Sequence, residues 1–256
     1  MLPNQISSMK ELFQHSFFAW HDNLRILFPY AFFCSIISLA FIRSPYLAQF
    51  ELHELIQHAH LNHYEPLYWD LGLSLLFALL SILTYTILLT KTNSVLNQTS
   101  LSALATIRHA FAKLPFLFMG LCLAILSLTV GFLAFAVPGF YILGVLFIFY
   151  PLIVIKENNV LSAFYDSFHL VRHHWWRTIA SLLLPSVLLT TFSQVFSNLL
   201  INLLPDTTHF LLKFIFLVLL CSFILGFILP WLSIQTVMLL NDLTLRSKKN
   251  NILNAA

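Results

Sequence analysis

Six long stretches without a charged residue limit what this sequence can fold into. They cover approximately residues 26–42, 71–90, 114–137, 139–155, 178–204 and 214–240. A helix rises 1.5 Å per residue, so about 20 apolar residues cross the roughly 30 Å of a bilayer's hydrocarbon core. The stretches therefore predict an all-α, polytopic membrane protein whose six transmembrane helices form a single domain over residues 1–256.

The composition agrees with a chain whose surroundings are mostly lipid. Of the 256 residues, 59% are apolar and only 9% are Asp, Glu, Lys or Arg, whereas a soluble domain carries about 25% charged residues. So few charges cannot cover the surface of a soluble fold. This argues against a disordered chain, an ordinary cytosolic enzyme and a nucleic-acid-binding protein.

The third and fourth stretches are joined without a charge between them. Residues 114–155 are too long for one span, and Val137-Pro138-Gly139 supplies a break, because proline lacks a helix donor and glycine permits a sharp turn. We predict two spans joined by a tight hairpin. The alternative is a deeply kinked or re-entrant pair that does not cross the bilayer.

The distribution of basic residues predicts the orientation. If both termini are cytoplasmic, the inside segments hold eleven of the 13 Lys and Arg residues, and the outside segments hold only Arg43 and Lys213. Acidic residues divide equally between the two sides. This is the bias of the positive-inside rule. It predicts a protein of the bacterial inner membrane with both termini in the cytoplasm and a periplasmic loop at 43–70.

A helical amphipathic segment precedes each outward-going span. Apolar residues recur at steps of three and four over 6–24, 101–114 and 160–175, and a cap-like cluster, Asn97-Gln98-Thr99-Ser100, precedes the second segment. The sequence thus predicts three hairpins, each preceded by an amphipathic interfacial helix. These helices are either elbows that turn the chain into the bilayer or a collar that binds anionic headgroups.

The third amphipathic segment ends in an aromatic and basic cluster. Guanidinium and imidazole groups bind phosphate, and tryptophan is enriched at membrane interfaces, so the cluster indicates headgroup contact. A generic membrane anchor is the alternative. The headgroup candidates are Arg172, His173, His174, Trp175, Trp176 and Arg177, together with Arg25 and Lys113 at the ends of the other two segments.

Polar side chains form a stripe along the fifth stretch. They are Ser186, Thr190, Ser193, Gln194, Ser197, Asn198 and Asn202. Because polar groups in lipid need partners, this face is expected to point into the helix bundle. It either lines a hydrophilic path or joins helices through hydrogen bonds.

Histidines are concentrated in the expected periplasmic loop. His53, His58, His60 and His63 lie near acidic residues at spacings that could hold a divalent cation. The set fits no recognised ligand motif, and the sequence favours a short solvated helix instead. We predict neither a metal nor a cofactor.

Residues 137–177 resemble a known family. They read VPGFYILGVLFIFYPLIVIKENNVLSAFYDSFHLVRHHWWR, and their Pro-Gly start, Tyr150-Pro151, the run into Glu157 and the Trp176-Arg177 end are similar to the YciC-like family. They also resemble the membrane domain of some bacterial glycerophosphodiester phosphodiesterases. The resemblance implies a polytopic helical inner-membrane protein and transfers no catalytic residue. Such proteins often have Gly after the Glu, where this chain has Asn158-Asn159, and Asn tolerates a left-handed turn.

Three functions are compatible with these features. The first is a noncatalytic inner-membrane protein with a role in envelope integrity or assembly, whose partners are membrane lipids or other inner-membrane proteins. The second is a transporter or lipid-translocating protein that uses the polar face of the fifth helix. An enzyme acting on a membrane-embedded substrate is the third and least supported, since the sequence has no common catalytic motif. The lack of a charge near the centre of any span argues against an ion-coupled transporter.

Overall fold

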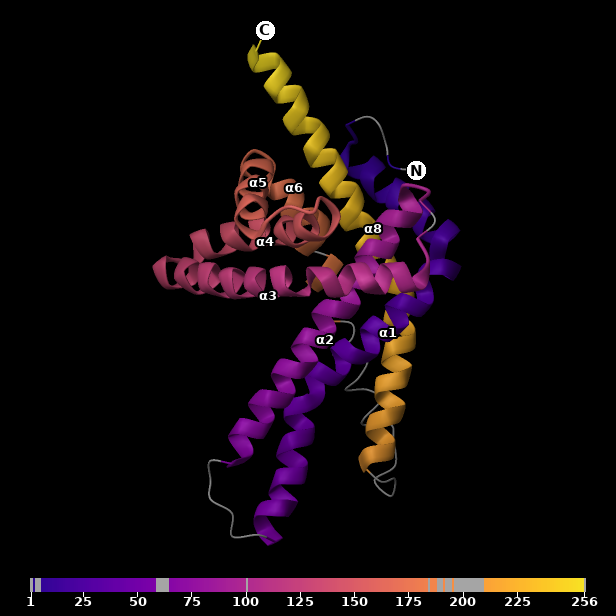
Figure 1. The fold of residues 1–256 in the computed structure, drawn as a ribbon, viewed down its shortest axis with the longest axis vertical. Helices are drawn as coiled ribbons and strands as arrows, with labels where there is room; N and C mark the ends of the chain where they lie inside the picture. The colour runs from indigo at the N-terminus through magenta and orange to yellow at the C-terminus, as the bar shows by residue number, and fades with distance from the viewer. Residues whose placement is uncertain are drawn as a thin grey trace.

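The computed structural model describes residues 2, 6–58, 65–99, 101–183, 185–187, 191, 195 and 210–255, and nearly all of them are helical. The long helices are α1 (Met9–His58), α2 (Glu65–Leu96), α3 (Ala103–Ala134), α4 (Ala136–Ile155) and α8 (Phe210–Ala255). The short helices α5 (Val160–Arg172) and α6 (Trp175–Thr178) follow α4, and the π-helical segment η1 (Ile179–Leu183) continues α6. Figure 1 shows both ends of the chain toward the same end of the molecule.

Five of the described helices are long and apolar enough to cross a membrane. The segments that meet this condition are Met9–Leu39, Leu75–Leu96, Ala103–Leu133, Val137–Ile155 and Val218–Lys249. They overlap the first four and the last of the expected spans, so the expected all-α class with several apolar helices is confirmed. The remaining expected span, 178–204, lies largely outside the described residues.

Two of the three expected interfacial helices are not separate elements, so this part of the prediction is wrong. Residues 9–25 form the first turns of α1, and residues 103–114 form the first turns of α3, which continues past Pro115. Neither junction contains a glycine that would end a helix, and a proline removes only one helix hydrogen bond. Only α5 is a separate amphipathic helix.

The loop expected at 43–70 is also largely helical. Helix α1 continues to His58, and α2 already begins at Glu65. The segment after Pro45 is rich in leucine and glutamate and contains no glycine, so it favours continuation of the helix. The expectation of a loop over the whole of 43–70 is therefore wrong.

The cluster Asn97-Gln98-Thr99-Ser100 closes the preceding helix rather than opening the next one. The backbone N–H of Gln98 donates to Val95 O at 3.1 Å, and that of Thr99 donates to Ser94 O at 2.9 Å. This is the Schellman pattern of a helix C-terminus, and Gln98 has the left-handed φ of 57° that it requires. The N-cap of α3 is Ser102, whose side chain accepts from the backbone N–H of Ala105.

Replacing Gln98 with glycine is expected to raise the free energy of unfolding by about 0.5–1 kcal/mol. Glycine adopts a positive φ without the Cβ clash that glutamine incurs, and this gain exceeds its larger entropy in the unfolded chain. Thermal unfolding in detergent measures the effect. Gln98→Ala retains the Cβ and should bring no gain, so equal stability of the glycine and alanine variants would contradict the assignment.

Helices α3 and α4 form a hairpin that breaks at Phe135, with φ −171° and ψ 158°. The expected break at Val137-Pro138-Gly139 is therefore two residues late. Pro138 lies in the first turn of α4, where its missing N–H costs no helix bond. Gly139 has no positive φ. It instead allows close approach of α3, because a Cβ there would lie 2.5 Å from the Phe132 ring.

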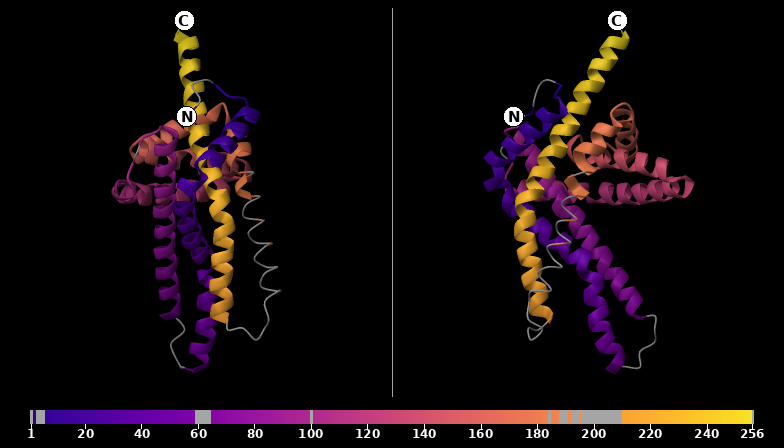
Figure 2. Two further views of the ribbon diagram at one scale, coloured as in Figure 1. Left: turned by 90° about the vertical axis from the view of Figure 1, so that its right-hand side faces the viewer. Right: turned by 180° about the vertical axis from the view of Figure 1, so that it is seen from behind.

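The hairpin runs crosswise to α1, α2 and α8 and projects from the side of the molecule (Figures 1 and 2). Six parallel spans are therefore not the arrangement of the described helices. Helix α3 packs on α2 and α4, and α4 in turn contacts α2, α5 and α8. The base of the hairpin is thus fixed, while its tip lies away from the other helices.

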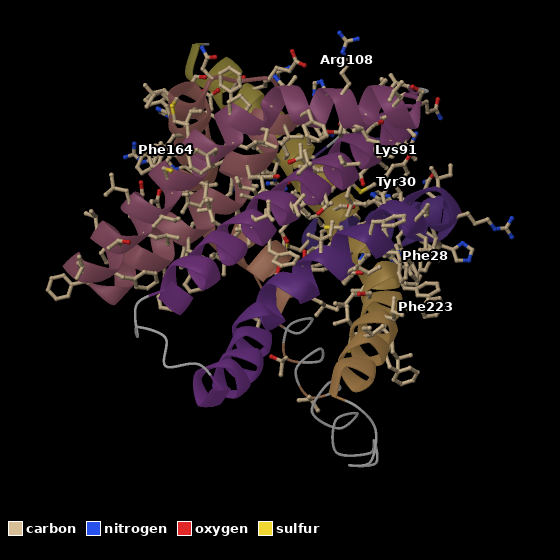
Figure 3. The ribbon with its side chains drawn as sticks, turned by 60° about the horizontal axis from the view of Figure 1, so that its bottom comes forward. Phe28, Tyr30, Lys91, Arg108, Phe164 and Phe223 are labelled. Carbon is tan, nitrogen blue, oxygen red and sulfur yellow. The ribbon has the colours of Figure 1, made fainter. Side chains whose placement is uncertain are left out.

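Helix α1 packs along α2 and α8 through tightly fitted aromatic and small residues. The Phe28 ring of α1 lies 5.7 Å from Phe223 and 4.8 Å from Phe227 of α8, measured between centroids (Figure 3). A Cβ on Gly226 would lie 3.1 Å from the Phe28 ring, so glycine permits this approach. The main hydrophobic core draws on α1, α2, α3, α4, α5 and α8, with fully buried Leu12, Leu27, Leu89, Leu152, Ile234 and Met238.

Candidate functional site

The docking of α5 on α4 positions the aromatic and basic cluster. One face of α5 is buried, and its members are Val160, Ala163, Ser167, Leu170 and Val171. The Ser167 hydroxyl also donates to the backbone carbonyl of Val145 in α4. The turn at His173-His174 then leads directly into α6. The cluster therefore lies where α5 meets α6, and both of these short helices pack on α4.

Trp175 is the central side chain of the cluster. Its ring stacks on Tyr141 of α4, with centroids 6.2 Å apart and an interplanar angle of 21°, and it meets Trp176 edge to face at 4.5 Å. It also lies against Gly144, where a Cβ would be 2.6 Å from the indole Nε1. The absence of a side chain at Gly144 thus makes room for Trp175.

All six residues of the cluster line one open cavity of about 450 Å³, together with Tyr141. Arg172, His173 and Trp176 are exposed, whereas Arg177 is half-buried. Trp176 is 76% exposed, which suits a ring that enters the headgroup region of a membrane. Cationic and aromatic groups in one cavity can hold a phosphate or carboxylate beside an apolar chain.

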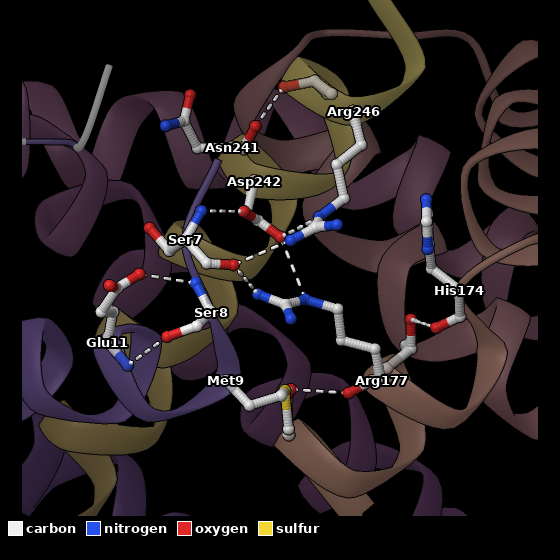
Figure 4. A network of polar contacts seen from close by, with 12 residues as sticks. Ser7, Ser8, Met9, Glu11, His174, Arg177, Asn241, Asp242 and Arg246 are labelled. Carbon is white, nitrogen blue, oxygen red and sulfur yellow. Dashed lines mark hydrogen bonds and ion pairs between the residues drawn. The ribbon is translucent and has the colours of Figure 1, made fainter. Parts of the chain in front are cut away.

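Arg177 belongs to a buried polar network, which we call the Asp242 clasp and define as Ser7, Arg177, Asp242 and Arg246 (Figure 4). The Asp242 side chain is 1% exposed, and its Oδ2 accepts from Arg177 Nε at 3.0 Å and from Arg246 Nε at 2.9 Å. Its Oδ1 accepts from the backbone N–H of Ser7 at 2.9 Å. Both arginines also donate to the Ser7 carbonyl, at 2.6 and 2.8 Å.

The Asp242 clasp leaves a positive charge beside the cavity, since it contains two guanidinium groups and one carboxylate. Burial and then the charges of Arg246 and Arg177 lower the pKa of His174 from its ordinary value of 6.5. His174 is therefore neutral at pH 7. Its Nε2 is buried and has no hydrogen-bond partner among the described residues. A neutral imidazole can donate to or accept from a bound polar group, depending on its tautomer.

The other two headgroup candidates lie elsewhere. Arg25 is an exposed residue of α1 and does not line the cavity. Lys113 of α3 places its Nζ 3.9 Å from Glu157 Oε1, and His109 Nε2 is equally far from that oxygen. Glu157 takes the left-handed φ of 57° at this turn, where the sequence favoured Asn158 or Asn159. Lys113 thus joins α3 to the turn after α4.

The polar stripe of the fifth stretch is described only at Ser186, because Thr190, Ser193, Gln194, Ser197, Asn198 and Asn202 lie outside the described residues. Ser186 lines a second cavity of about 250 Å³ with Tyr85, Tyr150 and Thr236. His60 and His63 are likewise outside the described residues, and only the backbone is described at His53 and His58. Among the residues that were described, no group of three potential metal ligands occurs.

Sequence reasoning missed the residues that hold the cluster in place. Asp242 and Arg246 are four apart on one helix, a spacing that indicates an ion pair. No local pattern connects them with Ser7, which is 235 positions from Asp242. Tyr141 and Gly144 lie in an apolar run and gain their roles only through the packing of α6 on α4.

The fold defines the class of this chain as an all-helical protein with several helices fit to cross a membrane. Comparisons with protein-family models, curated proteins and solved structures gave no match.

Proposed function

We propose that this chain is a noncatalytic integral protein of the bacterial inner membrane that supports envelope integrity or assembly by binding anionic lipid headgroups. The observation that carries the proposal is the convergence of Arg172 through Arg177 on one cavity with Tyr141. Arginine and tryptophan around a shared space suit a phosphate group attached to an apolar chain. In this proposal the end of the molecule that carries the cavity and both termini faces the cytoplasm, and the distribution of basic residues supports this orientation.

Pairing of polar side chains between helices supports a packed rather than a catalytic interior. The Ser38 and Ser81 hydroxyls lie 2.9 Å apart, as do those of Thr92 and Ser233. Ser35 donates to the Ser222 carbonyl at 2.9 Å. Such bonds join α1 to α2 and α8, and α2 to α8. The resemblance of residues 137–177 to the YciC-like family points to the same kind of membrane protein.

Replacing Arg172 with alanine is expected to lower the affinity for anionic lipid about fivefold, because each basic residue near an anionic surface contributes about 1 kcal/mol. Arg172 is the suitable position, since Arg177 also stabilises the fold. Lipid adducts of the purified protein, titrated with phosphatidylglycerol and counted by native mass spectrometry, measure the change. Arg108→Ala is the matched control, because Arg108 is an exposed arginine of α3 that does not line the cavity (Figure 3).

Arg172→Lys keeps the charge and should retain most of the affinity. Unchanged adducts in Arg172→Ala would contradict headgroup binding at this cavity. An equal loss in Arg108→Ala would show attraction to the whole basic surface instead of to this site.

Lipid translocation is the second candidate function. It is favoured by the cavity at Ser186, whose hydroxyl-bearing neighbours Tyr85, Tyr150 and Thr236 come from α2, α4 and α8. A translocating protein reconstituted into vesicles would accelerate the exchange of labelled lipid between leaflets. A purely binding protein would leave that rate at the value of protein-free vesicles.

A further inference from the structure

The α3–α4 hairpin carries a broad apolar surface that remains exposed in the described structure. Leu133 at the end of α3 is 81% exposed, Phe135 at the break 76%, and Val137 in the first turn of α4 79%. The exposed surface continues along α3 through Leu104, Phe111, Phe118, Met119, Ile125, Leu126 and Val130. Soluble proteins rarely expose so much contiguous apolar surface, so it indicates contact with lipid or another apolar partner.

Charge is confined to the base of this hairpin. Arg108 and Lys113 lie in the first third of α3, and Lys156 and Glu157 follow the end of α4. The tip, residues 131–140, reads GFLAFAVPGF and contains no polar side chain. A hairpin that crosses the bilayer brings its turn to the far interface, where polar residues or Trp and Tyr are enriched. Residues 131–140 include none of them, and Tyr141, which directly follows, stacks on Trp175 at the headgroup cavity.

Part of the backbone of the tip is hydrogen-bonded within the hairpin, which matters in a nonpolar environment because each unpaired N–H there is costly. The N–H of Phe135 donates to Gly131 O at 3.2 Å, and that of Gly139 donates to Phe135 O at 3.3 Å. Pro138, in the first turn of α4, has no N–H to satisfy. The exposed Thr129 hydroxyl donates to Ile125 O within its own helix at 2.8 Å.

We infer that the α3–α4 hairpin is a wedge inserted into one leaflet, lying along the membrane plane with its exposed apolar surface among the acyl chains and its α5–α6 side toward the cytoplasmic headgroups (Figure 1). Its crosswise course relative to α1, α2 and α8 (Figure 2) supports this placement. Its partner is the acyl chains of the leaflet nearer the chain termini. Because only one leaflet accommodates the hairpin, the protein expands that leaflet relative to the other. This inference does not depend on headgroup binding at the α5–α6 cavity.

Two cysteine positions test the wedge in the full-length protein. The native Cys122 in the middle of α3 is exposed, whereas Cys34 and Cys221 are buried. One variant keeps Cys122 with the other two cysteines changed to alanine, and the second has Phe135→Cys with all three native cysteines changed to alanine. Both are reconstituted into phosphatidylethanolamine–phosphatidylglycerol vesicles. In the first experiment, a membrane-impermeant maleimide is added to each side of the vesicles in turn, and labelling of the cysteine is measured. In the second, a nitroxide is attached at each position. Its depth in the bilayer is calculated from its relaxation by oxygen, which partitions into lipid, relative to its relaxation by a water-soluble nickel chelate.

The expected result is that the maleimide reaches residue 135 from neither side and that positions 122 and 135 lie at similar depths within one leaflet. Labelling of residue 135 after detergent solubilisation shows that its thiol is reactive, and Lys248→Cys at the exposed end of α8 marks the side of the termini. Labelling of residue 135 from the side opposite Lys248→Cys would overturn the wedge in favour of a spanning hairpin. Labelling from the same side, or efficient Cys122–Cys122 cross-linking between two copies, would also overturn it.

Discussion

Replacing Asp242 with alanine is expected to destabilise the folded protein by about 3–5 kcal/mol, since removal of one partner from a buried ion pair leaves an uncompensated charge. Arg177 and Arg246 would then face each other without the carboxylate between them. Their side chains are only 14% and 22% exposed, so water compensates incompletely. The backbone N–H of Ser7 would also lose its acceptor.

Reversible unfolding in a detergent titration measures this loss, and limited proteolysis near residue 7 detects release of the N-terminal segment. The matched control is Asp22→Ala, because the Asp22 side chain is 75% exposed and its nearest partner is His21 at 3.6 Å. Exposed pairs contribute little, so that change should stay within about 0.5 kcal/mol. Equal stability of the Asp242 and Asp22 variants would show that the clasp does not stabilise the fold.

Replacing Gly144 with alanine is expected to cost about 1–3 kcal/mol, because an added methyl group in a filled space forces its neighbours to move. The new Cβ would lie 2.6 Å from Trp175 Nε1, 2.8 Å from Trp175 Cδ1 and 3.2 Å from Ile179 Cδ1. The indole would have to leave its stacked position on Tyr141, which also lines the cavity. Anionic-lipid adducts should therefore decrease together with stability.

Gly72→Ala in α2 is the matched control, because no atom of the described side chains lies within 4 Å of a Cβ at that position. There the change should be neutral or stabilise by up to about 1 kcal/mol, since alanine favours a helix over glycine. A double-mutant cycle with Trp175→Phe isolates the contact, because the smaller ring relieves the clash and should reduce the cost of Gly144→Ala. A cost that is independent of residue 175 would contradict the packing described.

The parts of the fold that follow from average hydropathy could be predicted from the sequence. Charge-free runs locate the apolar segments of α1, α2, α3, α4 and α8, because the cost of placing charge in lipid acts residue by residue. Helix boundaries could not be predicted in the same way. An amphipathic pattern does not show where its helix ends. Helix α5 ends soon after its amphipathic segment, whereas the helices that contain residues 9–25 and 103–114 continue into an apolar segment.

The candidate site likewise has residues that the sequence could predict and residues that it could not. Arg172 to Arg177 are adjacent in the chain, so their shared cavity was accessible to sequence reasoning. The supports of the site are not local: Gly144 acts through a contact with α6, and Ser7 through a contact with α8. The direction of the α3–α4 hairpin also depends on packing at its base, and its composition alone is equally compatible with a hairpin that spans the membrane.

The Asp242 clasp joins Ser7 to Asp242, which lies 235 positions later in the chain. Ser7 is synthesised long before Asp242 and Arg246. Its backbone therefore has no partner in the clasp until the helices between them have been made. A chain that stops before residue 242 would present Arg177 without its carboxylate. The clasp thus forms only after this part of α8 has been made, and a chain truncated before residue 242 would leave its N-terminal segment open to proteolysis.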